Sequence, residues 1–181
     1  MRGGDAGDDR VGGGEHEANG ADHVDRIQAQ WHRERPGLDV SPVGVIGRLH
    51  RIGDRLRAEL VALYRRYGLG EGEFDVLATL RRTGKPYELT PGVLAQHTMV
   101  TTGAVSKRLD RLESAGLVQR RSSEHDGRGR VVGLTEAGLE LIDGAFAAHM
   151  RNEQRLLAGL DDAQRAQLES LLRTWMRALE D

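Results

Sequence analysis

The sequence predicts a mainly α-helical fold with one small β-hairpin, and three observations carry this prediction. Apolar residues recur at intervals of three and four along most of the 181 residues, as they do on the inner faces of helices. Residues 91–115 read as a short helix, a tight turn and a longer helix. Two short strand-like runs, 118–122 and 131–134, follow them. This order is that of a winged helix-turn-helix, a module that lays one helix in the DNA major groove and a basic hairpin beside it.

Helix-capping residues set the expected limits of the elements. Ser41 and Thr90 each precede a proline, which gives a capping hydroxyl followed by proline at the first helical position, and Gly116 ends a helix. The start of the chain is rich in Gly and Asp and should be disordered. The expected order is a disordered tail at 1–20, an extra N-terminal helix at 21–36, a long helix at 42–68, a winged helix-turn-helix domain at 70–135 with helices near 71–82, 91–97 and 101–115, and two long helices within 136–181.

The outer helices, at 42–68 and 136–181, carry more apolar surface than one small domain can cover. The last of them has a wide apolar face. We therefore expect these segments to be dimerisation helices that build a homodimer, which would present two DNA-reading heads to a two-fold operator. The apolar face of the last helix consists of Leu168, Leu171, Leu172, Trp175, Met176 and Leu179.

Charge is distributed unevenly along the chain, although the net charge is only −2. Residues 85–133 contain eight Lys and Arg against five Asp and Glu, whereas the rest of the chain contains 18 against 23. A basic patch on an acidic body favours local contact with DNA phosphates.

The composition also excludes several classes of site. The chain has no cysteine, which excludes disulfides, thiolate zinc sites and thiol-based redox sensing. No apolar run approaches the roughly 18–20 residues that span a membrane, and the start does not resemble a signal peptide, so we expect a cytoplasmic, nucleoid-associated bacterial protein. The seven histidines lack zinc-ligand spacing, and no nucleophile–base pair stands out. We therefore expect no metal, no cofactor and no enzyme activity.

The helix at 101–115 is expected to read DNA with its N-terminal end, because that end reaches base edges and small hydroxyl residues permit close approach. In the hairpin, Arg128 and Arg130 lie at a loop tip, where arginine suits a narrow minor groove, and Asp126 is expected to brace Arg128. The alternative is a solvated charged hairpin on a winged helix that binds proteins. The residues expected to contact DNA are Thr101, Thr102, Gly103, Ser106, Lys107, Arg111, Arg121, Asp126, Arg128 and Arg130.

Two charged residues stand where aliphatic ones are expected. Arg108 lies on the apolar stripe between Val105 and Leu112, and Asp75 interrupts the apolar segment 74–80. A buried charge is costly unless it is paired, so we expect a salt bridge between Asp75 and Arg108. Either this pair is a packing device, or a small anion competes with Asp75 for Arg108 and displaces the DNA-reading helix.

Four runs of sequence resemble the MarR family of bacterial regulators, and the similarity covers about residues 42 to 180. This resemblance implies dimeric winged-helix repressors with a ligand pocket between the dimerisation region and the DNA-binding lobe. It also implies that Arg128 enters the minor groove and that Asp126 orients it. The runs are SKRLDRLE at 106–113, LVQRR at 117–121, DGRG at 126–129 and LTEAG at 134–138.

Trp31, Asp75, Arg108 and Arg120 resemble the signature of the urate-responsive branch of that family, which also has an additional N-terminal helix. The resemblance implies urate or a related planar anion as the ligand. The indole of Trp31 and the two guanidinium groups would be its hydrogen-bond donors. Similar sites in related proteins accept tricarboxylates such as citrate or trans-aconitate, which two arginines would serve equally well.

The expected function is that of a homodimeric, ligand-responsive transcriptional repressor on double-stranded DNA. Its operator would be a pseudo-palindrome with half-sites about one helical turn apart. A regulator that senses a tricarboxylate or a phenolic compound is the alternative within this class. An architectural or protein-interaction winged helix without an inducer is the alternative outside it.

Overall fold

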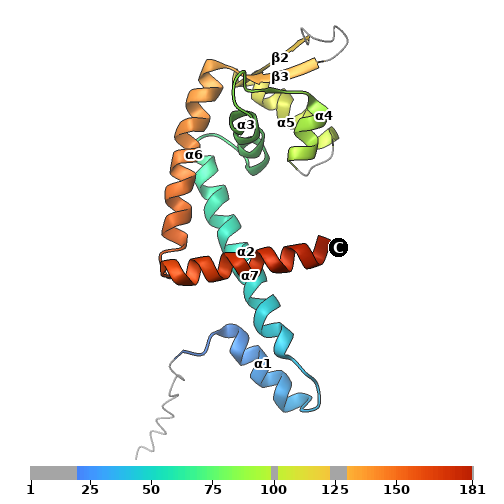
Figure 1. Cartoon of the computed structure of the whole chain (residues 1–181), viewed down its shortest axis with the longest axis vertical. Helices are drawn as coiled ribbons and strands as arrows, with labels where there is room; N and C mark the ends of the chain where they lie inside the picture. Colours follow the sequence, from blue (N-terminus) through green and yellow to red (C-terminus); the bar gives the residue numbers. More distant parts are fainter. Residues whose placement is uncertain (1–19, 99–101, 123–129, 181) are drawn as a thin grey trace, which may run out of the picture. The chain divides into compact units, whose positions relative to one another are not determined.

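The computed structural model describes residues 20–98, 102–122 and 130–180 (Figure 1). The chain divides into two compact units, Met1–Asp54 and Arg55–Asp181, and each is described by itself. None of the described helices is long and apolar enough to cross a membrane. The elements are α1 (His23–Glu34), α2 (Ser41–Arg65), α3 (Glu71–Arg82), β1 (Glu88–Leu89), α4 (Pro91–His97), α5 (Thr102–Ser114), β2 (Val118–Ser122), β3 (Arg130–Leu134), α6 (Glu136–Leu156) and α7 (Asp162–Glu180).

The first unit consists of α1 and the N-terminal part of α2. Asp22 caps α1 by accepting hydrogen bonds from the backbone of Val24 and Asp25, and Arg48 of α2 binds both aspartates at 2.8 and 2.6 Å. Val24 is buried against α2 where Gly47 leaves room for it. An additional N-terminal helix is therefore present, over residues 23–34. The tail expected at 1–20 lies outside the described residues, apart from Gly20.

The core of the second unit is mostly aliphatic and is shared by helices α3 to α6 and the sheet, with Tyr64 of α2 and Phe74 as its aromatic members. Each of these elements contributes at least one side chain that is almost fully buried. On α5 these are Val105, Leu109 and Leu112, as their spacing predicts. The mainly helical fold with a small wing is thus confirmed. The other fully buried large side chains of this core are Val76, Leu77, Leu80, Leu94, Val132 and Ile142.

The three strands form one antiparallel sheet in the order β1–β3–β2. The wing strands β2 and β3 pair with Val118 opposite Leu134. The sequence did not indicate β1, because it is only two residues long and pairs through Glu88 and Leu89 alone.

The end of α5 and the start of α6 are tightly joined. Gly116 ends α5 with a φ of +70°, a conformation that favours glycine. The Thr135 hydroxyl donates to the Gly116 carbonyl at 2.7 Å and accepts from the Gly138 N–H at 3.0 Å. A Cβ on Gly138 would lie 1.9 Å from the Leu117 carbonyl oxygen, so only glycine permits this approach.

Two expectations about the outer helices need correction. Ser41 is the first residue of α2 rather than its cap, and its N–H donates to Asp39 at 2.9 Å. The spacing of Phe146, four residues after Ile142, predicts that it faces the core, but Phe146 is 44% exposed at the edge of a cavity. On α7 no described residue is buried within the chain.

Candidate functional site

The exposed side of α5 carries the polar side chains expected to meet DNA. Ser106 and Lys107 are exposed, directly after the buried Val105. Arg130 is exposed at the start of β3. Thr101, Asp126 and Arg128 lie outside the described residues, as do the side-chain environments of Thr102 and Gly103, so the DNA contacts expected of them stay predictions.

Two of the expected DNA-binding arginines have carboxylate partners within the chain. Arg111 Nε lies 3.0 Å from an oxygen of Glu73 on α3. Arg121 donates to both oxygens of Glu88 on β1, at 2.9 and 2.6 Å. Neither pair is indicated by the sequence, because the partners lie more than 30 residues apart along the chain.

Arg120 is held on the wing by carboxylates of α5. Its guanidinium donates to Asp110 at 2.6 Å and to Glu113 at 2.7 Å. The hydrogen bond to Asp110 is the main reason that the pKa of Arg120 is raised. Arg120 does not line the cavity described next, and its expected role as a second cation for a ligand stays a prediction.

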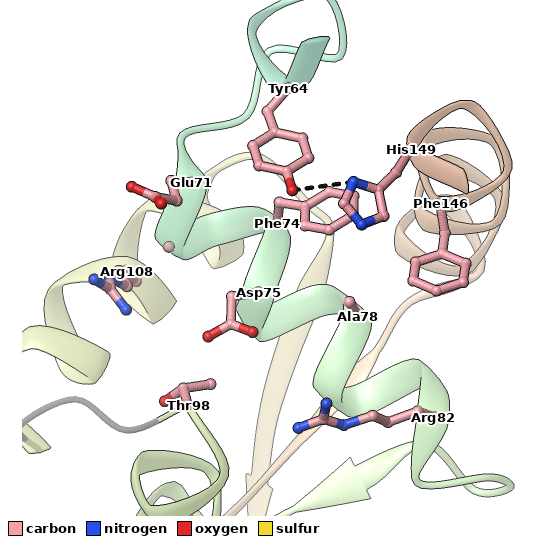
Figure 2. A pocket seen from close by; sticks show the side chains of 11 residues that line it. Tyr64, Glu71, Phe74, Asp75, Ala78, Arg82, Thr98, Arg108, Phe146 and His149 are labelled. Atoms are coloured by element: carbon pink, nitrogen blue, oxygen red, sulfur yellow. Dashed lines mark hydrogen bonds between the residues drawn. The ribbon is translucent and has the colours of Figure 1, made fainter. Parts of the chain in front are cut away.

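A cavity of about 540 Å³ opens along α3 in the second unit (Figure 2). This volume lies within the usual range of ligand pockets, roughly 300–1,000 Å³. It joins the end of α2, the C-terminal end of α4, α5 and α6, so four elements besides α3 contribute to its wall. The lining residues are Tyr64, Glu71, Gly72, Phe74, Asp75, Ala78, Arg82, Thr98, Arg108, Phe146 and His149.

One side of the cavity is charged. Asp75 and Arg108 both line it, as their unusual positions suggested, but the predicted salt bridge between them is not formed among the described residues. Burial raises the pKa of Asp75, and the charges of Arg82 and Arg108 partly oppose this rise. Arg82 donates to the His97 carbonyl at 3.3 Å. The second cation of the cavity is therefore Arg82, seven residues after Asp75 on the same face of α3, a spacing that could have indicated it.

The other side of the cavity is aromatic. The rings of Tyr64 and Phe74 stack with centroids 4.0 Å apart, and Phe146 lies nearly parallel to Phe74 at 6.4 Å.

His149 is 9% exposed and lies between Tyr64 and Glu153. Its Nδ1 is 3.2 Å from Tyr64 Oη, and its Nε2 is 3.1 Å from Glu153 Oε1. Burial, with the charge of Glu153 next in size, raises the pKa of Tyr64 to about 12.

Sequence reasoning found only part of this lining. It identified Asp75 and Arg108 from misplaced charge, but it did not single out Tyr64, Arg82 or His149. Helical spacing predicts core positions for Tyr64 and Phe146. Tyr64 is indeed in the core and also lines the cavity, whereas Phe146 is exposed at its edge. Trp31 lies on α1 in the first unit and is 48% exposed, and its expected role in ligand binding stays a prediction.

Comparison with known proteins gives concordant results. A model of the MarR family matches residues 67–129. The HTH-type transcriptional regulator PecS of Dickeya dadantii is 38% identical over 149 residues, which cover 82% of this chain and 90% of PecS. The HTH-type transcriptional repressor Rv2887 of Mycobacterium tuberculosis is 34% identical over 134 residues, which cover 74% and 93%.

Solved structures show the same fold. A single-site mutant of MarR from E. coli, complexed with operator DNA, matches with a TM-score of 0.63 and 27% identity, over 80% of this chain and 96% of that chain. AbsC from Streptomyces coelicolor, described as a MarR family transcriptional regulator, matches with a TM-score of 0.69 and 24% identity, over 79% and 97%.

Proposed function

Because this chain belongs to the MarR family, and is thus a DNA-binding transcriptional regulator, we propose that it is a homodimeric repressor that a small planar anion releases from DNA. The observation that carries this proposal is the double role of α5. This helix exposes Ser106 and Lys107 on one side, and it sends Arg108 into the cavity on another. A ligand that binds Arg108 therefore acts directly on the DNA-reading helix.

The homodimer is supported by the apolar side of α7. Leu171, Met176 and Leu179 lie on one side of this helix, as buried residues would, yet they are 62%, 55% and 70% exposed. Such an apolar face, left uncovered within one chain, favours a second copy as its cover. Two copies would place two α5 helices on a pseudo-palindromic operator.

The DNA contacts that we propose combine base reading by α5 with minor-groove binding by the wing. The N-terminal end of a recognition helix reaches base edges, and an arginine at a wing tip suits the negative potential of a narrow minor groove. Asp126 would orient Arg128, as the resemblance implies. The residues proposed are Thr101, Thr102, Gly103, Ser106, Lys107, Arg111, Arg121, Asp126, Arg128 and Arg130.

The charges of the cavity favour a planar ligand of low charge. The lining holds two cations, Arg82 and Arg108, and two carboxylates, Asp75 and Glu71. Glu71 is paired with Arg57 at 3.0 Å, whereas Asp75 forms no ion pair among the described residues. A trianion such as citrate would meet the Asp75 carboxylate. Urate carries one negative charge at neutral pH, can bind a guanidinium through adjacent acceptors, and can stack on the exposed ring of Phe146. In this proposal urate competes with Asp75 for Arg108, and the part expected of Trp31 stays a separate prediction.

The proposal is tested with the full chain and a DNA duplex selected by it from a random pool. Urate, citrate, trans-aconitate and a phenolic carboxylate are each assayed for a rise in Tm and for release of the duplex. We expect urate to do both in the wild type, and Arg108→Ala to abolish both. Lys107→Ala is the matched control, since it changes the neighbouring exposed cation on α5 and should weaken DNA binding without changing the rise in Tm.

Three outcomes would overturn the proposal in different ways. If citrate or trans-aconitate acts and urate does not, the ligand class is wrong while the cavity remains the site. If no anion acts, Asp75 and Arg108 have a structural role only. If binding is equally strong on every duplex, the result favours an architectural winged helix without an inducer.

A further inference from the structure

Two side chains of α5, Arg108 and Arg111, contact the first turn of α3. Glu73, which is 5% exposed, accepts a hydrogen bond from the Gly70 N–H at 2.7 Å and lies 3.0 Å from the Nε of Arg111. The residue before it, Gly72, lies directly beneath the guanidinium of Arg108. The DNA-reading helix is therefore attached to α3 at two neighbouring points, and one of them is in the cavity.

The contact at Gly72 leaves no space for a side chain. A Cβ built on Gly72 would lie 2.2 Å from both Cζ and Nε of Arg108 and 2.6 Å from Nη2. Carbon atoms that are not bonded do not approach so closely, so the guanidinium and a Cβ at position 72 exclude each other. The backbone of Gly72 is ordinary α-helix, and alanine has the higher helix propensity there. A Cβ at position 72 would therefore displace the flexible end of Arg108, so the observed position of this guanidinium depends on the glycine.

The position of this contact also determines what Arg108 faces. Asp75 follows Gly72 by three residues, so the two lie on one side of α3, one turn apart. A guanidinium that rests on Gly72 is therefore beside the Asp75 carboxylate, and both lie at the charged side of the cavity (Figure 2).

We propose that Gly72 is a positioning residue that seats the Arg108 guanidinium in the cavity, and that it thereby sets the geometry of the anion site and the attachment of α5. The part of this inference that concerns a ligand rests on the proposed function. The seating of Arg108 beside Asp75 does not, and it can be measured without ligand or DNA.

The test is Gly72→Ala, with Gly144→Ala as the matched control. Both changes replace a helical glycine, but a Cβ at position 144 meets only the ring of Tyr67 at an ordinary 4.0 Å. The carboxyl carbon of Asp75 is followed by NMR as a function of pH, with the signal assigned by Asp75→Asn. We expect its pKa to rise in Gly72→Ala and in Arg108→Ala, because the nearby positive charge has left, and to stay unchanged in Gly144→Ala.

The second measurement is the response to urate. In Gly72→Ala we expect the urate concentration for half-maximal DNA release to increase by about tenfold or more, as expected for the loss of a charge-assisted contact. Gly144→Ala should respond as the wild type does. The double variant Gly72→Ala/Arg108→Ala has no overlap between Cβ and guanidinium, so it should recover any stability that Gly72→Ala loses.

The outcomes separate the inference from the proposed function. An unchanged Asp75 pKa in Gly72→Ala, or a double variant no more stable than Gly72→Ala where that variant is destabilised, would overturn the inference. A raised Asp75 pKa together with a wild type that ignores urate would support the seat and refute urate as the ligand. If urate releases DNA from Gly72→Ala at the same concentration as from the wild type, the link between the position of Arg108 on Gly72 and the anion site would be overturned.

Discussion

Helices α5 and α7 are both amphipathic, yet they use their apolar faces differently. On α5, Val105, Leu109 and Leu112 are at most 2% exposed, because α3, α4 and the wing cover them. On α7 no described residue is buried, and Leu171 remains 62% exposed. Helical periodicity therefore identifies an apolar face, but it does not indicate whether the same chain or a second copy covers that face.

The largest effect should come from the face that the chain covers itself. Leu109→Ala removes a side chain that is 1% exposed, and loss of such a leucine typically costs about 2–5 kcal/mol. We expect a large fall in the denaturant midpoint, measured by circular dichroism. Lys107→Ala, an exposed change on the same helix, should leave the midpoint within experimental error. A stable Leu109→Ala protein would show that α5 does not belong to the core.

Leu171→Asp tests the face of α7 that the chain leaves uncovered. A leucine buried in an interface contributes about 1.5–3 kcal/mol, so we expect the dimer dissociation constant to rise at least about tenfold. Sedimentation velocity at several protein concentrations measures this change. Ser170→Asp places the same charge on the opposite side of α7 and should leave the dimer intact. If the two variants sediment alike, the apolar face of α7 is not the dimer interface.

A smaller effect is expected where α5 is attached to α3. Glu73→Ala removes the side-chain cap of α3 and the partner of Arg111, which should reduce the free energy of unfolding by about 1–2 kcal/mol. Arg111→Ala should cost less than about 1 kcal/mol, because its side chain is 70% exposed and solvent screens the ion pair. Urea denaturation of both variants measures the difference. Equal losses would mean that the ion pair, rather than the cap, dominates.

The smallest effect concerns pH. Burial raises the pKa of Asp75 above 3.8 in the folded protein. At a pH between 3.8 and this raised pKa, Asp75 is protonated in the folded protein but ionised in the unfolded chain. Ionised Asp75 therefore costs stability at neutral pH, and this cost disappears as the pH falls through the folded pKa and below 3.8. We expect Asp75→Asn to be slightly more stable than the wild type at pH 7 and equal to it in strong acid. Thermal unfolding across that range provides the measurement, and a constant difference would contradict it.

Local signals predicted much of the fold. The limits 71–82 and 91–97 match α3 and α4, because capping residues such as Thr90 act on their own helix. The buried stripe of α5 follows from spacing in the same way. The two-residue β1 was missed, since its pairing with β3 is a tertiary contact without a pattern of its own.

The cavity was predicted less completely, for a related physical reason. Misplaced charge identified Asp75 and Arg108, but their predicted salt bridge assumed that a half-buried charge must find a direct partner. Instead the Arg108 guanidinium rests on Gly72, and Arg82 supplies the second cation. Which polar groups meet across helices depends on packing geometry, and a single sequence does not contain that information.

The Thr135 hydroxyl has a mechanical consequence for the whole regulator. It binds the carbonyl of the residue that ends one helix and an amide in the first turn of the next, while the Leu117 carbonyl rests directly on Gly138. These contacts tie the end of α5 to the start of α6, so we expect the two helix ends to move together when either is displaced. A displacement of α6 would then be passed on to α5, the helix expected to read DNA.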